Sequence, residues 1–173
     1  IEWRSFQAIA SHPAVAWAIP VSLGDAHHGF PVVGTTAEYF ERFRYGAKQP
    51  LHIVEGRPFG EVFEAVIGSD VATKLRYRVG DRIVLAHGAE EHSREHGDKP
   101  FVVMGILART GTPVDRSVHV SLQGLEAIHL EWQAGAPVPG LVIPADLVRK
   151  FDLSPKEITA ALDNLHEHLI DGL

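Results

Sequence analysis

The sequence predicts an α+β fold, and three observations support this prediction. Short strand-like segments are mixed with short helical patterns, without the regular β–α alternation of a doubly wound sheet. The 173 residues suffice for one ordinary domain or two small ones, and 45% hydrophobic with 22% charged residues is typical of a chain with a packed core. We expect a mixed α/β lobe from residues 1–61 and 121–173, and a small mainly β lobe from residues 62–120.

The N-terminal part predicts a β-hairpin followed by a helix. Residues 14–23 and 30–33 read as two extended segments, and the glycine- and aspartate-containing stretch 24–29 reads as the turn between them. Thr35-Thr36-Ala37-Glu38 then matches a capping box, which marks a helix start. The short helix after it should bury Tyr39, Phe40 and Phe43.

The middle of the chain predicts three strands and one short helix. Val62–Ile67 is an apolar strand, and Ser69 or Asp70 can cap the helix that follows it. Residues 82–86 and 101–107 are strands of a hairpin, separated by a long polar loop over 87–100. If this register is right, most of one set of apolar side chains is buried, namely Ile67, Ile83, Leu85, Val102 and Ile106.

The C-terminal third predicts a strand and two helices. Ser117–Ser121 alternates, with Val118 and Val120 on one face and His119 on the other. Helical spacing follows from Leu122 and is broken by a glycine- and proline-containing linker over 134–140. Ser154-Pro155-Lys156-Glu157 combines a capping box with proline at the first helical position, and predicts a final helix.

Composition and motifs exclude several classes of function. The formal net charge is −6 and no cluster of Lys and Arg reverses it locally, so we expect no nucleic-acid partner. Cysteine is absent, which leaves no thiolate nucleophile or cysteine-based zinc site. No P-loop and no Gly-x-Ser-x-Gly motif is present. The chain begins with Ile1, which favours a segment cut from a longer protein.

Histidine is the unusual residue type, with 11 copies. His92 and His96 share a face at i, i+4 if the polar loop forms a helical turn, a spacing that suits zinc, and His87 could complete the site. His27 and His28 are a second candidate pair, although adjacent side chains often point apart. The alternative interpretation of both segments is a solvated polar loop.

The same loop formally matches the zinc-protease pattern H-x-x-E-H, with Glu95 as the base. That chemistry needs a rigidly anchored helix, whereas Ala89 is the only apolar residue between His87 and Pro100. A zinc-binding or metal-sensing loop therefore fits better than a zinc hydrolase. We predict no catalytic residue and no required cofactor, with zinc as the candidate metal.

A series of turn motifs in shared order resembles the MacB-type extracytoplasmic domain of ABC transporter permeases, in the FtsX-like permease family. The series covers roughly residues 14–122, and the match fades beyond about residue 131. It consists of Val33-Gly34-Thr35-Thr36, Glu38-Tyr39-Phe40, Gly56-Arg57-Pro58-Phe59, Ala65-Val66-Ile67-Gly68, Val79-Gly80-Asp81 and Val103-Met104-Gly105-Ile106-Leu107.

The resemblance implies a MacB-type periplasmic domain that transmits motion rather than performing chemistry. In that family the domain lies between two membrane helices of a permease in the bacterial inner membrane, and faces the periplasm or the cell exterior. Its implied partners are the permease transmembrane helices, a separate ATP-binding subunit, a second permease copy in a dimer, and a periplasmic partner protein.

Overall fold

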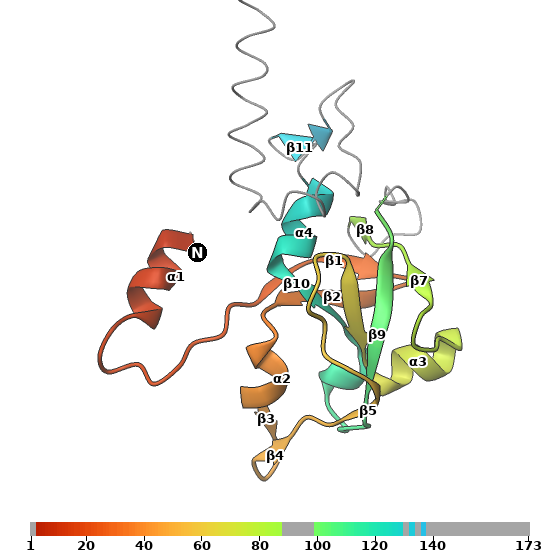
Figure 1. Ribbon diagram of the computed structural model, residues 1–173, viewed down its shortest axis with the longest axis horizontal. Coiled ribbons are helices and arrows are strands. Elements are labelled where there is room, and N and C mark those ends of the chain that lie inside the picture. The colour runs from red at the N-terminus through yellow and green to blue at the C-terminus, as the bar shows by residue number, and fades with distance from the viewer. Residues whose placement is uncertain (1–2, 88–98, 130–131, 134–135, 138–173) are drawn as a thin grey trace, which may run out of the picture.

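The computed structural model describes residues 3–87, 99–129, 132–133 and 136–137. Its centre is an eight-stranded mixed sheet in the order β5–β9–β6–β10–β2–β1–β8, with β7 also paired to β9 (Figure 1). The strands of this sheet are β1 (Ser22–His27), β2 (Phe30–Thr35), β5 (Ile53–Gly56), β6 (Glu64–Ile67), β7 (Arg82–Ile83), β8 (Ala86–His87), β9 (Phe101–Leu107) and β10 (Val118–Ser121).

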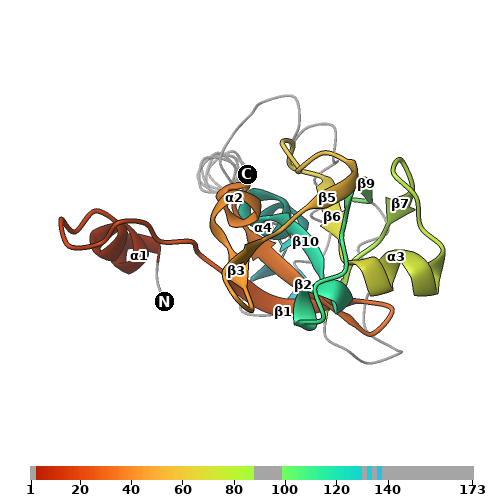
Figure 2. The same cartoon turned by 90° about the horizontal axis from the view of Figure 1, so that it is seen from below.

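Helices and two small ribbons surround this sheet. In Figures 1 and 2, α1 lies away from the sheet, at the far end of the segment that leads into β1. The remaining elements are α1 (Trp3–Ala10), α2 (Glu38–Arg42), α3 (Ser69–Leu75), α4 (Leu122–His129), the 3-10 helix η1 (Pro113–Arg116), and the paired strands β3 (Arg44–Tyr45) with β4 (Gln49–Pro50) and β11 (Trp132–Gln133) with β12 (Ala136–Pro137).

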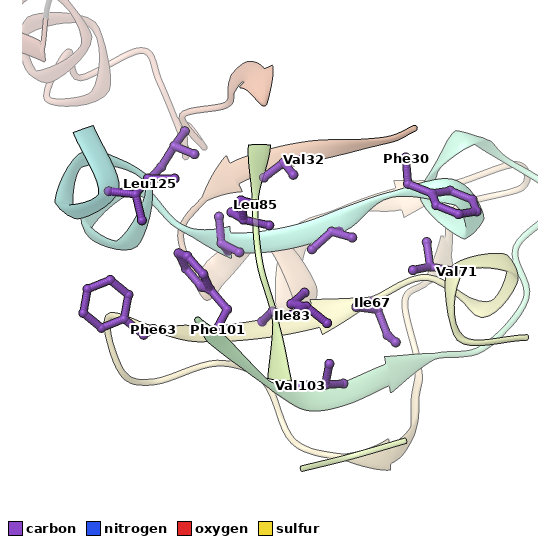
Figure 3. Packing of buried hydrophobic residues seen from close by; sticks show 14 of the residues in the cluster. Phe30, Val32, Phe63, Ile67, Val71, Ile83, Leu85, Phe101, Val103 and Leu125 are labelled. Atoms are coloured by element: carbon purple, nitrogen blue, oxygen red, sulfur yellow. The ribbon is translucent and has the colours of Figure 1, made fainter. Parts of the chain in front are cut away.

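The predicted α+β class is confirmed, and its central strands are buried on both faces. In β6 and β9, side chains on opposite faces enter two separate hydrophobic cores, and in β10 Val118 and Val120 enter the larger one. Figure 3 shows the larger core, where Phe63 and Phe101 pack edge to face at 5.5 Å between ring centroids. Four of the five side chains predicted to be buried are at most 7% exposed, and Val102 is half-buried.

The smaller core lies on the opposite face of the sheet. It contains Tyr39 and Phe40 of α2, together with Phe59 and the strand residues Val66 and Leu107. The ring of Phe40 packs edge to face on Phe59 with a centroid distance of 5.3 Å. The predicted burial of Tyr39 and Phe40 is confirmed, and Phe43 is half-buried beside them.

The first hairpin is confirmed, but its boundaries differ from the prediction. Its turn is only His28-Gly29, and both residues have positive φ, 46° and 76°, as a type I′ turn requires. Residues 24–27 belong to β1, because a bulge between Leu23 and Ala26 absorbs the extra length. Residues 14–20 form no strand.

The predicted helix caps are wrong, although both helices exist. The Thr35 hydroxyl donates to the Pro20 carbonyl at 2.8 Å instead of capping α2. In α3 the cap position is Gly68, which carries no side chain, and Ser69 and Asp70 are already inside the helix. A capping pattern therefore located each helix start within one or two residues without predicting its hydrogen bonds.

The second hairpin is only partly formed. β7 pairs with β9, as predicted, through Ile83 opposite Phe101. The next short strand, β8, leaves this pairing and lies antiparallel to β1, with Asp25 opposite His87. The chain therefore crosses from one end of the sheet to the other just before the segment 88–98, which lies outside the described residues.

Strands assigned to the two predicted lobes share one sheet. β2, from the predicted mixed lobe, lies parallel to β10 of the predicted mainly β lobe, with Val32 opposite Val118. Phe30 and Val32 also enter the larger core. The division into lobes stays a prediction, because residues 138–173, including the expected final helix, are beyond the described part of the chain.

Candidate functional site

The predicted histidine site is only partly covered by the described residues. His92 and His96 lie outside them, as does Glu95 of the H-x-x-E-H pattern. For His87 the backbone is described: it ends β8, with its Cα opposite that of Asp25. Zinc binding by His87, His92 and His96 therefore stays a prediction, but the base of the loop is placed at the β1 edge of the sheet.

His27 and His28 lie in different surroundings. His27 is buried, and its Nδ1 donates to the Val84 carbonyl at 2.7 Å while its Nε2 accepts from the Tyr77 hydroxyl at 2.9 Å. The two ring nitrogens therefore link β1 to Val84, which leads into β8, and to Tyr77, which follows α3. His28 is exposed in the turn. A metal shared by the two residues would require His27 to give up one of these bonds.

The structure brings together one pair that the sequence pattern did not indicate, Asp25 of β1 and His129 at the end of α4. His129 Nε2 lies 3.5 Å from Asp25 Oδ1, and the Asp25 side chain is only 3% exposed. His129 Nδ1 lies 2.6 Å from the Leu125 carbonyl oxygen one helical turn earlier. The strand β8 pairs with β1 at this edge, while α4 packs against β10 and β2 (Figure 1).

The surroundings of His129 shift its proton affinity. Burial alone would lower the pKa of His129, but the hydrogen-bonding and charge of Asp25 and the Leu125 carbonyl outweigh burial and raise the pKa. Sequence reasoning assigned Asp25 to a turn and did not single out His129. Only the β1 bulge and the docking of α4 on the sheet bring them together, and no spacing rule carries that information.

A third buried histidine lies at the centre of the sheet. His119 of β10 is 0% exposed, as predicted on the face opposite Val118 and Val120, and packs against the rings of Tyr39 and Phe40. Its Nδ1 lies 3.3 Å from the Val66 carbonyl, and Nε2 has no hydrogen-bond partner among the described residues. Burial lowers the pKa of His119 to about 4, so the ring is neutral at pH 7.

An open cleft of about 720 Å³ lies between α3, β5 and the end of β9. Arg76, Arg78 and Arg109 line it, with Glu55 as the opposing charge. Arg76 ends α3 with a φ of 57°, in the left-handed conformation. The cleft is locally positive in a chain whose formal net charge is −6.

The loop that follows Arg109 of this cleft is held by one buried carboxylate. Asp115 accepts from the Thr110 amide and hydroxyl and from the Gly111 amide, each at 2.7 Å, and these bonds fix the turn. Burial alone would raise the pKa of Asp115, but these bonds and the charge of Arg109 lower it overall.

Within the described ranges, no group of three or more His, Asp or Glu side chains is arranged to hold a metal.

The family model for the MacB-like periplasmic core domain matches residues 1–147 of the 173. The chain belongs to this family. The match confirms the predicted family, and a periplasmic core domain is extracytoplasmic, as predicted. The segment 87–96, with the three histidines predicted to bind zinc, falls inside the matched range.

The periplasmic core domain has a distant structural neighbour. A crystal structure of "a domain of a putative Permease protein" from Porphyromonas gingivalis shares 10% identity, with a TM-score of 0.43. The match covers 75% of this chain, and this chain spans 59% of that neighbour. No curated protein sequence matches the domain. Among its described helices, none is both long and apolar enough to cross a bilayer.

Proposed function

We propose that this domain is a non-catalytic coupling element of a bacterial ABC permease. It passes motion of the membrane helices, driven by ATP hydrolysis on a separate ATP-binding subunit, to a substrate or a periplasmic partner protein. The observation that carries the proposal is the family match over residues 1–147. The lack of a P-loop in the sequence supports it, because the energy must then come from another part of the machine.

The proposed setting is a permease dimer in the inner membrane, with this domain in the periplasm. The sheet has a hydrophobic core on each of its two faces, and such packing resists deformation. The domain should therefore move as a rigid body. We infer that the domain changes its contacts with neighbours rather than its internal fold.

Hydrogen exchange of the full-length permease with its ATP-binding subunit tests the coupling role. We expect amide protection at the surface of residues 3–129 to differ between the ATP-bound and ADP-bound states of a hydrolysis-deficient complex. Protection within β6, β9 and β10 should stay unchanged, which serves as the internal control. Identical exchange of the whole domain in both states would contradict the proposal.

The isolated 173-residue chain provides the second control. It should bind no ATP and show neither ATPase nor peptidase activity. If ATP changes the hydrogen exchange of this chain alone, nucleotide binding belongs to the domain itself. Zinc-dependent peptidase activity that is lost in Glu95→Gln would instead favour the hydrolase alternative.

We also propose zinc binding by the loop residues His87, His92 and His96. The i, i+4 spacing of two of them supports it, as does the position of His87 at the start of the loop. Calorimetric titration of zinc into the wild type and into His92→Ala/His96→Ala should show a large loss of affinity in the variant. Binding should also be lost below a pH of about 6, because imidazole must be neutral to coordinate. Equal zinc affinity of the wild type and of His92→Ala/His96→Ala would contradict zinc binding by this loop.

A further inference from the structure

The cleft between α3, β5 and the end of β9 gathers three guanidinium groups against one carboxylate. Arg76 and Arg78 follow α3, Arg109 follows β9, and all three side chains are exposed. Glu55 of β5 is the only carboxylate among the described residues that line the cleft. The strand β9 contacts both β5 and α3 (Figure 1). With about 720 Å³, the cleft lies within the range of about 300–1,000 Å³ that is usual for ligand sites.

The three arginine side chains have no acceptor that neutralises them. Within the described part of the chain, none of their guanidinium groups forms a hydrogen bond or an ion pair. The charge of Arg109 acts on Asp115, but that carboxylate is buried and already accepts three hydrogen bonds. Like charges held near one another repel, so an anion in the cleft lowers the electrostatic free energy.

The backbone of Arg76 is an independent indication that its side chain matters. Arg76 follows α3 with a φ of 57° and a ψ of 35°, in the left-handed region. Glycine is the usual residue at such a helix end, because a Cβ makes this conformation costly. The chain therefore accepts backbone strain at a position where it adds a guanidinium to the cleft, and such strain is typical of ligand-binding sites.

The surroundings of the cleft favour an extended peptide as the ligand. β5 is the last strand at its end of the large sheet, so an extended segment can lie beside it. Val54 of this strand also lines the cleft and is 60% exposed, which offers an apolar contact. One ion pair at an exposed site contributes little. A ligand with several carboxylates on one chain gains more, because its second and third contacts are intramolecular.

We propose that this cleft binds an extended acidic peptide segment, whose carboxylates pair with Arg76, Arg78 and Arg109. The proposal rests on the coupling function in one respect, since it gives the chemistry of the segment by which a periplasmic partner protein contacts the domain. The site itself consists only of residues of this chain. It is separate from the zinc loop, since none of the three loop histidines lines the cleft.

Calorimetric titration of the peptide hexaglutamate into the 173-residue chain at low salt tests the cleft. We expect saturable binding that weakens as salt is added, because salt screens exposed charges. Hexaglutamine, which has the same backbone and no charge, is the control peptide and should not bind. No binding of hexaglutamate at millimolar concentration, or equal binding of the two peptides, would overturn the proposal.

Variants of the lining residues assign the binding to this cleft. Arg76→Gln and Arg109→Gln should each weaken hexaglutamate binding by about two- to fivefold, as expected for one exposed ion pair. Glu55→Gln should strengthen it, because the variant removes the opposing carboxylate. Arg42→Gln is the matched control, since it removes the same charge from an exposed site in α2, on the other face of the sheet. Wild-type affinity in all of these variants would reject the cleft.

Arg76→Gly separates a binding role from a structural one. Glycine adopts the left-handed backbone without strain, so this variant should unfold close to the wild-type temperature or above it. Its affinity for hexaglutamate should nevertheless fall about as far as that of Arg76→Gln. A variant that unfolds at a lower temperature and binds as the wild type does would assign Arg76 to the stability of α3 and contradict the proposal.

Two further probes test other anionic ligands. Phosphatidylglycerol vesicles, with phosphatidylcholine vesicles as their control, test for a membrane surface, and inorganic phosphate tests for a small anion. Binding of either probe that requires Arg76 and Arg109, without binding of hexaglutamate, would overturn the acidic peptide as the ligand.

The cleft and the coupling function can fail separately. If hexaglutamate does not bind while the permease complex keeps its nucleotide-dependent hydrogen exchange, the cleft proposal falls and the coupling function stands. If hexaglutamate binds in the cleft and the exchange does not depend on nucleotide, the coupling function falls and the peptide site stands.

Discussion

His119 shows how one side chain can set a pH dependence for the whole fold. The ring is fully buried between α2 and the sheet, and burial lowers its pKa to about 4. In the unfolded chain His119 has an ordinary histidine pKa near 6.5. At a pH between the two values it is therefore protonated in the unfolded chain and neutral in the folded chain. Between these two values the unfolded state binds more protons, so the free energy of unfolding rises with pH.

We expect this contribution to change stability by roughly 1.4 kcal/mol per pH unit at most within that window. His119→Phe, which keeps a ring between Tyr39 and Phe40, should remove the slope between pH 4 and about 6.5. Urea unfolding at several pH values measures it. His52→Gln is the control, and a slope that survives unchanged in His119→Phe would show that His119 is not its source.

Glu64 carries the opposite kind of pH dependence. It forms two hydrogen bonds with the Arg57 guanidinium, at 2.6 and 2.9 Å, and accepts from the Gly60 and Glu61 amides. Burial alone would raise the pKa of Glu64, but these bonds and the charge of Arg57 lower it. Its contribution to stability is therefore present above the ordinary glutamate pKa and lost as pH falls through the lowered value.

Glu64→Gln should destabilise the chain at pH 7 by about 1–3 kcal/mol, because the variant leaves the loop amides and Arg57 poorly paired. The loss should shrink as pH falls through the lowered pKa of Glu64, where the wild-type side chain itself becomes protonated. Chemical denaturation measures the difference. Glu61→Gln, which changes an exposed carboxylate next to the same loop, should leave stability nearly unchanged.

At the scale of elements, Gly68 fixes the approach of η1 to the start of α3. A Cβ at this position would overlap the carbonyl oxygens of Val114 and Asp115. The Gly68 amide also donates to the Ser117 carbonyl at 2.9 Å, which links the β6–α3 junction to the strand β10. This close backbone contact is possible only without a side chain.

Gly68→Ala should therefore cost about 1–3 kcal/mol through overpacking, or more if η1 is displaced. Gly60→Ala is the matched control, because a Cβ there meets nothing closer than 3.5 Å. Thermal unfolding of the two variants decides the matter. Equal melting temperatures would show that η1 moves away without cost.

The sequence predicted the helices and strands that a local pattern of residues specifies. An apolar run located β6, alternation located β10, and helical spacing located α4, because buried faces impose such patterns on the chain. Segment 14–20 is apolar and is therefore predicted to be part of a strand. It forms no strand, and its Trp17 is 51% exposed. The crossing of β8 to β1 depends on pairing between distant segments, which no local pattern specifies.

The same limit applies to the candidate site. The His87, His92 and His96 spacing could be read directly from the loop, and stays a prediction. Asp25 and His129 come from opposite ends of the sheet-forming region, and their contact depends on a bulge and on helix docking. Sequence reasoning found the residues that a motif names, whereas the structure was needed for those that only the fold brings together.

At the scale of the whole molecule, the sheet lies between two cores of different composition. The larger core is mainly aliphatic with Phe30, Phe63 and Phe101, and α3 and α4 cover it. The smaller core combines three aromatic side chains with aliphatic ones and is covered by α2. The residues of both cores come from most of the sheet strands, so the described region should unfold as one cooperative unit.

The position of β10 has a consequence for how the chain is made. Among the strands of the large sheet it is the last in the sequence, yet it lies in the middle, parallel to β2 and antiparallel to β6. Until Val118–Ser121 has emerged on the outer side of the membrane, β2 and β6 each expose an edge that is not yet paired. The emerging chain therefore contains two parts of the sheet that β10 has not yet joined.

A fragment that ends at residue 116 should accordingly fail to fold, although it contains most of the strands. We expect it to lack the cooperative urea transition of the full chain and to aggregate through the open edges. Adding a synthetic peptide with the sequence of residues 117–129 should restore both solubility and the transition. In the cell, this arrangement delays completion of the fold until the final strand is synthesised, which favours protection of the nascent chain by a chaperone until then.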